Sequence, residues 1–106
     1  MDTSKKLRHV VLFGFKPEVS AAQVIKIVER FGALKELIPE VEAFEWGVDV
    51  SPEGLGQGHT HCFTLTFASE AARDTYLTHP HHQSFVTWLG PYAEKALVID
   101  YWASAP

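Results

Sequence analysis

The apolar residues of this chain recur with two periods, one typical of β-strands and one typical of α-helices. Alternating positions rich in β-branched and aromatic residues, such as the run Val10-Val11-Leu12-Phe13, predict strands. A stretch rich in glycine and proline, residues 51–58, predicts a loop between two of them. The ranges expected to be strands are 8–16, 41–50, 59–67 and 97–102.

Serine N-caps and prolines mark the boundaries of the predicted helices. Pro80 disfavours helical geometry in the residue before it, so a helix that carries Tyr76 should end there and another should begin. The helices are expected from Ser20 to Pro39, from Ser69 to about Thr78 and from His81 to Leu89. The resulting order, β-α-β-β-α-β with the second helical part broken in two, predicts an α+β fold of ferredoxin-like type. In this sandwich the helices cover one face of an antiparallel sheet.

The predicted strands are apolar on both faces, whereas a sheet covered by helices on one side should be polar on the other. The face that the helices should leave open carries Val10 and Leu12 on the first strand and Leu97, Ile99 and Tyr101 on the last. A chain of 106 residues has no third layer to cover it. We therefore expect a homodimer, sheet against sheet, which is a dimeric α+β barrel.

Composition and charge narrow the function classes. The net charge is −4 and the lysines and arginines are scattered, so we expect no nucleic-acid partner. No apolar run approaches the ~20 residues of a membrane span, and we expect no membrane contact. The single cysteine, Cys62, fits a reducing compartment and a cytoplasmic location. Residues 1–7 are expected to be disordered or extended, with one domain over residues 8–104.

The segment Tyr76-Leu77-Thr78-His79-Pro80-His81-His82 carries the densest candidate chemistry. An imidazole exchanges protons near neutral pH, and a phenol can donate to a developing oxyanion. Because the predicted bend can turn Tyr76 and His82 toward one point, they are candidates for a general acid/base pair. The structural alternative is that His82 satisfies helix-end carbonyls and Tyr76 packs on the sheet.

Two further histidines, His9 and His61, share strand parity with core residues and should point toward the helices. They are either polar groups in a pocket or satisfied core histidines. The six histidines raise the question of a metal, but no acidic residue lies inside their cluster, so we expect neither a metal nor a cofactor. Arg8 could form an interface ion pair with one of the strand acids Asp49 and Asp100.

With these motifs in hand, residues 8–102 resemble the stress-responsive A/B barrel (Dabb) family. The matching pieces are His9-Val10-Val11-Leu12-Phe13, Ile38-Pro39, Trp46-Gly47-Val48-Asp49, Thr60-His61, Phe67, Tyr76, His79-Pro80, His82 and Asp100-Tyr101. The resemblance implies a dimeric α+β barrel without a required metal. It also implies that a plant member, a polyketide cyclase that closes its substrate by an aldol condensation, uses a tyrosine and a histidine matching Tyr76 and His82, and pocket histidines matching His9 and His61.

The chain departs from that cyclase in its pocket. Ile27 and Val28 stand where the cyclase has bulky aromatics, Phe31 replaces a phenolic residue, and Ala93 replaces a tryptophan. The departures imply a pocket of different shape.

We predict one small apolar pocket between sheet and helices, the usual form of a small-molecule site. Its polar groups should be His9, His61, Tyr76 and His82. Its walls should be Val11, Phe13, Val24, Ile27, Val28, Phe31, Phe44, Phe63, Leu77, Phe85 and Val86.

Two functions fit this pocket: a cofactor-independent cyclase or proton-transfer enzyme acting on a polyketide-like ligand, or a non-catalytic module that binds a small apolar ligand or serves as a stress-associated structural dimer. Cofactor-free oxygenation is a weaker third hypothesis, because it needs an electron-rich substrate of which the sequence gives no sign.

Overall fold

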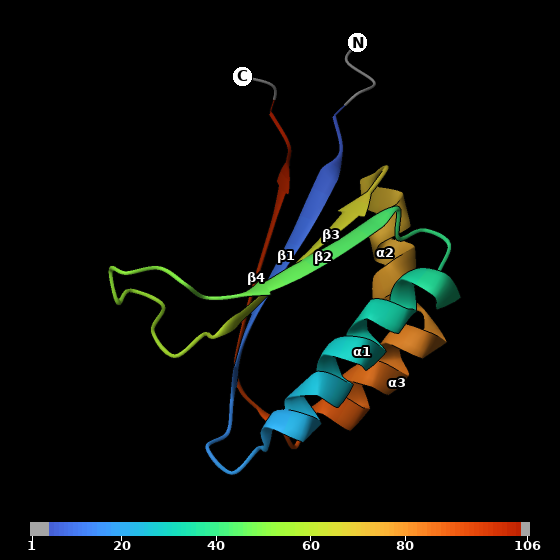
Figure 1. Ribbon diagram of the computed structural model, residues 1–106. Coiled ribbons are helices and arrows are strands. Elements are labelled where there is room, and N and C mark those ends of the chain that lie inside the picture. The colour runs from blue at the N-terminus through green and yellow to red at the C-terminus, as the bar shows by residue number, and fades with distance from the viewer. Residues whose placement is uncertain (1–4, 105–106) are drawn as a thin grey trace.

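A four-stranded antiparallel sheet and three helices that cover one of its faces make up the fold in the computed structural model, which describes residues 5–104 (Figure 1). This confirms the predicted ferredoxin-like α+β architecture. Of the expected disordered or extended N-terminus, residues 1–4 lie outside the described part, and a strand already begins at Leu7. The elements are β1 (Leu7–Phe15), α1 (Ala21–Leu37), β2 (Ala43–Val48), β3 (His61–Phe67), α2 (Glu70–Thr78), α3 (Pro80–Leu89) and β4 (Ala93–Trp102).

Strand β4 differs most from the prediction, because it begins at Ala93 rather than Leu97. The intervening residues are better helix formers than strand formers. They are nevertheless extended because they continue the ladder with β1, in which Phe13 pairs with Ala96 and Phe15 with Ala93 across an irregularity. Tertiary pairing therefore overrides local propensity here. Strands β2 and β3 are shorter than predicted, and residues 49–60 between them form a loop that projects away from the helices (Figure 1).

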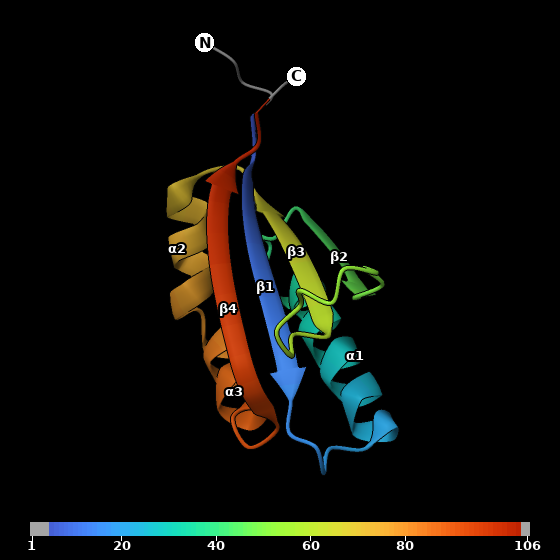
Figure 2. The same cartoon turned by 90° about the vertical axis from the view of Figure 1, so that its left-hand side faces the viewer.

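The strand order β2-β3-β1-β4 places β1 at the centre, with β4 at one edge (Figure 2). His9 of β1 lies opposite Leu65 of β3 and Asp100 of β4. Because side chains alternate between faces, His9, Val11 and Asp100 all lie on the face that the helices cover. This register decides which strand residues can reach a site beneath the helices.

The core lies between α1 and the central strands. Ile27, Phe31 and Leu34 recur at helical spacing on α1 and are buried. The ring of Phe31 packs on that of Phe63 with 4.6 Å between centroids. Ile27 and Phe63 are completely buried, so these two predicted pocket residues belong to the core.

The opposite face of the sheet is uncovered in the single chain (Figure 2). Ile99 is 54% exposed and Tyr101 49%, and Leu97 is exposed beside them. Leu12 pairs with Cys62 and Leu97 across this face. The structure thus confirms an apolar face that its own helices do not cover.

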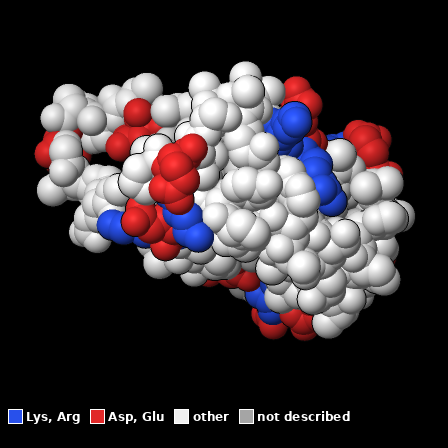
Figure 3. Space-filling view, turned by 90° about the horizontal axis from the view of Figure 1, so that it is seen from below, with Lys and Arg blue, Asp and Glu red and all other residues white. Residues whose placement is uncertain are grey.

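Charged residues of both signs lie in small groups separated by uncharged surface on the face seen in Figure 3. None of the helices described for residues 5–104 is both long and apolar enough to cross a membrane.

Candidate functional site: a cavity between the helices and the edge strand

The break between α2 and α3 is built by the sequence around Pro80. Proline has no backbone N–H, so it cannot donate to the carbonyl of Tyr76 as a continuing helix would require. That carbonyl instead accepts from the backbone N–H of His79 at 3.1 Å. The imidazole of His79 then caps α3 by accepting from the backbone N–H of His81 at 3.1 Å. The predicted break is confirmed, and it redirects the chain so that His82 folds back on Tyr76.

The carbonyl of Leu77 is left without a helical partner at the same break. The side chain of Gln83 donates to it at 2.7 Å, and Nδ1 of His82 lies 3.0 Å from it. These bonds anchor the imidazole of His82 against the end of α2. Its ring centroid is 4.4 Å from that of Tyr76.

Tyr76 presents a neutral phenol. The residue is completely buried, and within residues 5–104 its hydroxyl has no hydrogen-bond partner. Burial raises the pKa of the phenol above its ordinary value of 10.0, so the proton stays on the oxygen at neutral pH. An unpaired buried hydroxyl destabilises the fold, which makes this one a candidate donor for a ligand that enters the cavity beside it.

His82 presents a neutral imidazole, and within residues 5–104 only one of its nitrogens has a hydrogen-bond partner. Burial lowers its pKa below the ordinary value of 6.5, as does the positive charge that His9 can carry, while the bond to the Leu77 carbonyl opposes them. A carbonyl oxygen only accepts, so the nitrogen facing it carries the proton and Nε2 keeps its lone pair. The structural interpretation of His82 is thus met by one nitrogen, which satisfies a helix end, and the role of the other nitrogen as a base stays a prediction.

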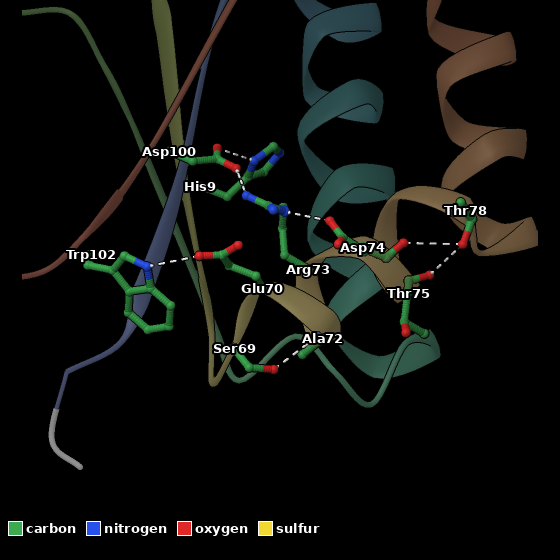
Figure 4. A network of polar contacts seen from close by, with 10 residues as sticks. All are labelled: His9, Ser69, Glu70, Ala72, Arg73, Asp74, Thr75, Thr78, Asp100 and Trp102. Atoms are coloured by element: carbon green, nitrogen blue, oxygen red, sulfur yellow. Dashed lines mark hydrogen bonds and ion pairs between the residues drawn. The ribbon is translucent and has the colours of Figure 1, made fainter. Parts of the chain in front are cut away.

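A chain of charged contacts closes the site on the β4 side (Figure 4). Nδ1 of His9 lies 2.7 Å from one carboxylate oxygen of Asp100, and Arg73 donates to the other at 2.8 Å. Arg73 also donates through Nε to Asp74 at 2.9 Å. Asp100 therefore fixes the ring orientation of His9 and is itself held by Arg73.

Together these residues border a cavity of about 670 Å³ between α2, α3 and β4. Its walls are largely apolar, and small side chains of β4 face the helices and leave it open. The lining residues are His9, Val11, Phe13, Phe31, Arg73, Asp74, Tyr76, Leu77, His82, Phe85, Val86, Leu89, Gly90, Ala93, Ala96, Val98 and Asp100.

The structure divides the predicted pocket in two. Val24, Val28, Phe44 and His61 line a separate hollow of about 520 Å³ between α1 and β2. There His61 stacks on Trp46 with 6.1 Å between ring centroids, and burial lowers its pKa. His61 is therefore not brought together with Tyr76 and His82, and its role in binding stays a prediction. The first cavity, which Tyr76 and His82 border, is lined by these other predicted pocket residues: His9, Val11, Phe13, Phe31, Leu77, Phe85 and Val86.

Sequence reasoning missed the acidic and basic residues of the cavity. It paired a strand acid with Arg8, but Arg8 donates to Thr66 at 2.8 Å and Asp100 binds His9 and Arg73 instead. A signal was present: Arg73 precedes Tyr76 by one helical turn and so lies on the same side of α2. Within residues 5–104, no group of three or more histidine, cysteine or acidic side chains is placed to hold a metal ion.

Fold and cavity define a class: a ferredoxin-like α+β domain with a largely apolar cavity between sheet and helices. The sequence profile of the Stress responsive A/B Barrel Domain (Dabb) family matches residues 7–103. The chain therefore belongs to this family.

Two curated relatives align over almost the whole chain. The stress-response A/B barrel domain-containing protein HS1 of Arabidopsis thaliana is 42% identical over 95 residues, which cover 90% of this chain and 87% of that protein. Olivetolic acid cyclase of Cannabis sativa is 30% identical over 95 residues, with 90% and 94% covered.

Solved structures agree on the fold. A hydroxynitrile lyase from Passiflora edulis superimposes with a TM-score of 0.89 at 29% identity, with 95% of each chain covered. A dimeric ferredoxin-like protein of unknown function from Thermobifida fusca has a TM-score of 0.78 at 19% identity, covering 95% of this chain and 93% of that one, and shows the fold alone.

Proposed function

We propose that the cavity is the active site of a cofactor-independent enzyme that forms or breaks carbon–carbon bonds next to a carbonyl by general acid/base catalysis. The observation that carries the proposal is the buried hydroxyl of Tyr76, which has no partner in the described part of the chain, beside the neutral imidazole of His82 in an apolar cavity. A donor and an acceptor that face one space are what proton transfer at a carbonyl compound requires.

In the forward direction the steps are those of an intramolecular aldol addition. Nε2 of His82 removes a proton from the carbon α to a carbonyl, and the enolate oxygen accepts a hydrogen bond from Tyr76. The α-carbon then bonds to a second carbonyl carbon of the same molecule. The resulting alkoxide takes the proton back from His82, so atoms and charge balance.

The two named enzymes among the relatives support this chemical class. Ring closure by a cyclase joins two carbons of one molecule. In cyanohydrin cleavage, the reaction class of a hydroxynitrile lyase, a base takes the hydroxyl proton, the bond to the nitrile carbon breaks, and the proton passes to the departing cyanide. Both reactions need one base and one donor at a carbonyl oxygen. The second candidate is a binding module without turnover, favoured by the stress-response description of HS1.

The test is a screen of β-polyketones and aromatic cyanohydrins with matched variants. His82→Ala should abolish turnover, and Tyr76→Phe should reduce it less, because the ring still fills its place. The two effects should be non-additive, since the residues act as one unit. The control is His81→Ala, whose exposed side chain lies outside the cavity lining and should leave turnover unchanged.

Two outcomes would contradict the assignment. Turnover that survives His82→Ala and is lost with a chelator would replace the base with a metal. Tight binding of the polyketones without turnover of any compound would favour the binding module.

We also propose that the protein is a homodimer whose two copies meet through the sheet face that the helices leave uncovered. The uncovered apolar side chains of β1 and β4 support it, because exposed apolar patches of this kind mark interfaces. Sedimentation of a well-folded wild-type monomer at micromolar concentration would contradict it.

A further inference from the structure

We propose that this cavity selects uncharged ligands, namely neutral ketones, aldehydes or hydroxy compounds with an apolar body, and rejects carboxylates. The inference rests on the proposed function only in taking the cavity as a small-molecule site. It concerns the charge of the ligand, which neither the family nor its named relatives define for this chain.

The charged side chains that line the cavity carry a net negative charge. Among the described residues, Arg73 is the only lysine or arginine that borders the cavity, and it donates to both Asp74 and Asp100. One positive and two negative side chains leave a net charge of −1 there. With His82 neutral, a proton on His9, 2.7 Å from Asp100, would bring the sum to zero. The cavity thus has no unpaired cation to offer a carboxylate.

The interior of the cavity offers a ligand no charged hydrogen-bonding group. Tyr76 supplies one neutral O–H and His82 one neutral acceptor nitrogen, with Val11, Phe85 and Leu89 beside them. A carboxylate placed there would find one donor for its two oxygens and would face a lone pair. Burying an ion without a charged partner is strongly unfavourable.

A neutral carbonyl compound fits the same groups. Its oxygen accepts from Tyr76, and its hydroxyl or α-carbon proton faces His82. The volume of about 670 Å³ lies in the range of small-molecule sites and leaves room for an apolar body along Val11, Phe85 and Leu89. The charged rim of the cavity, formed by Arg73, Asp74 and Asp100, disfavours an anion before it enters, and the apolar interior disfavours it afterwards.

A matched probe pair tests the selection by binding alone, without need of turnover. The probes are 4-phenylbutan-2-one and 3-phenylpropanoate, which share a phenethyl body and differ by a methyl group against a carboxylate oxygen. Affinity is measured by calorimetry at neutral pH and low salt, and the His82 ring signals are followed by NMR to locate the bound probe. We expect the ketone to bind at least about tenfold more tightly.

Charge variants separate the rim from the rest of the surface. Asp74 is 65% exposed, so Asp74→Asn should leave the fold intact. This variant should bind the carboxylate more tightly, so the ratio of ketone affinity to carboxylate affinity should fall by about two- to threefold. The difference from wild type should become smaller at high salt. The control is Glu36→Gln, an exposed acid on α1 away from the cavity, which should leave the ratio unchanged.

A carboxylate that binds as tightly as the ketone, with His82 perturbed by both, would overturn the charge selection and leave the small-molecule site standing. Binding of neither probe at His82 would overturn the selection and the proposed site together.

Discussion

Removing the hydroxyl of Tyr76 should stabilise the ligand-free protein while weakening its ligand binding. The hydroxyl is buried and unpartnered within the described residues. An unsatisfied buried hydroxyl costs about 1–3 kcal/mol, whereas the ring itself packs on Phe67 and His82 and is retained in Tyr76→Phe. We therefore expect the free energy of unfolding to rise by about 1 kcal/mol. For a domain of this size that corresponds to about 4–8 °C in Tm.

The assay is urea unfolding and calorimetry of wild type and variant at equal protein concentration, because association makes Tm depend on concentration. Tyr92→Phe is the matched control: Tyr92 is half-buried, its ring packs on Trp88, and its hydroxyl is not among the buried unpartnered atoms. Its removal should change stability by less than about 0.5 kcal/mol.

The directions in which Tyr76→Phe changes the free energy of unfolding and the affinity for ligand decide between the interpretations. A buried donor kept for a ligand gives a variant that is more stable and binds neutral ketones more weakly, by up to about tenfold for one hydrogen bond. If Tyr76→Phe lowers the free energy of unfolding by 1 kcal/mol or more, then the hydroxyl has a structural partner and the donor role is wrong.

Three further outcomes are expected. Because burial lowers the pKa of His82 below 6.5, the acidic limb of a pH–rate profile should have its midpoint below pH 6.5. Below pH 6.5 the imidazole of His82 takes up a proton more readily in the unfolded chain than in the folded one, so the free energy of unfolding should also fall as the pH drops below 6.5. A midpoint of the acidic limb above pH 6.5 would contradict the base assignment. Asp100→Asn should cost about 1–3 kcal/mol in urea unfolding, because Asp100 holds both His9 and Arg73, while Asp74→Asn should cost less than about 0.5; the reverse order would disprove the ranking. Leu12→Asp or Ile99→Asp should give monomeric or aggregating chains in sedimentation, and an unchanged dimer would exclude the open sheet face as the interface.

The sequence alone determined the fold and the helix break that brings His82 against Tyr76. Alternation and helical spacing report directly which side of a strand or helix is apolar, so the ferredoxin-like order and the uncovered sheet face could be predicted. Pro80 acts on its immediate neighbours, so the break between α2 and α3 was predictable too. The lowered pKa of His82 and the unpartnered hydroxyl of Tyr76 were not, because both depend on what surrounds the side chains.

Only the tertiary structure decided which residues share the cavity. The sequence placed His61 with Tyr76 because strand parity gives the face of a residue but not its position across the sheet. Helix α1 lies on that face with Phe31 toward one cavity and Val28 toward the other, and so it separates the two hollows. In the same way, β4 begins at Ala93 because its first residues pair with β1. The small side chains of β4 that face the helices leave the cavity open. The contact of Asp100 with Arg73 joins residues distant in the chain, and such a contact has no local signature because it depends on the packing of α2 against the edge strand.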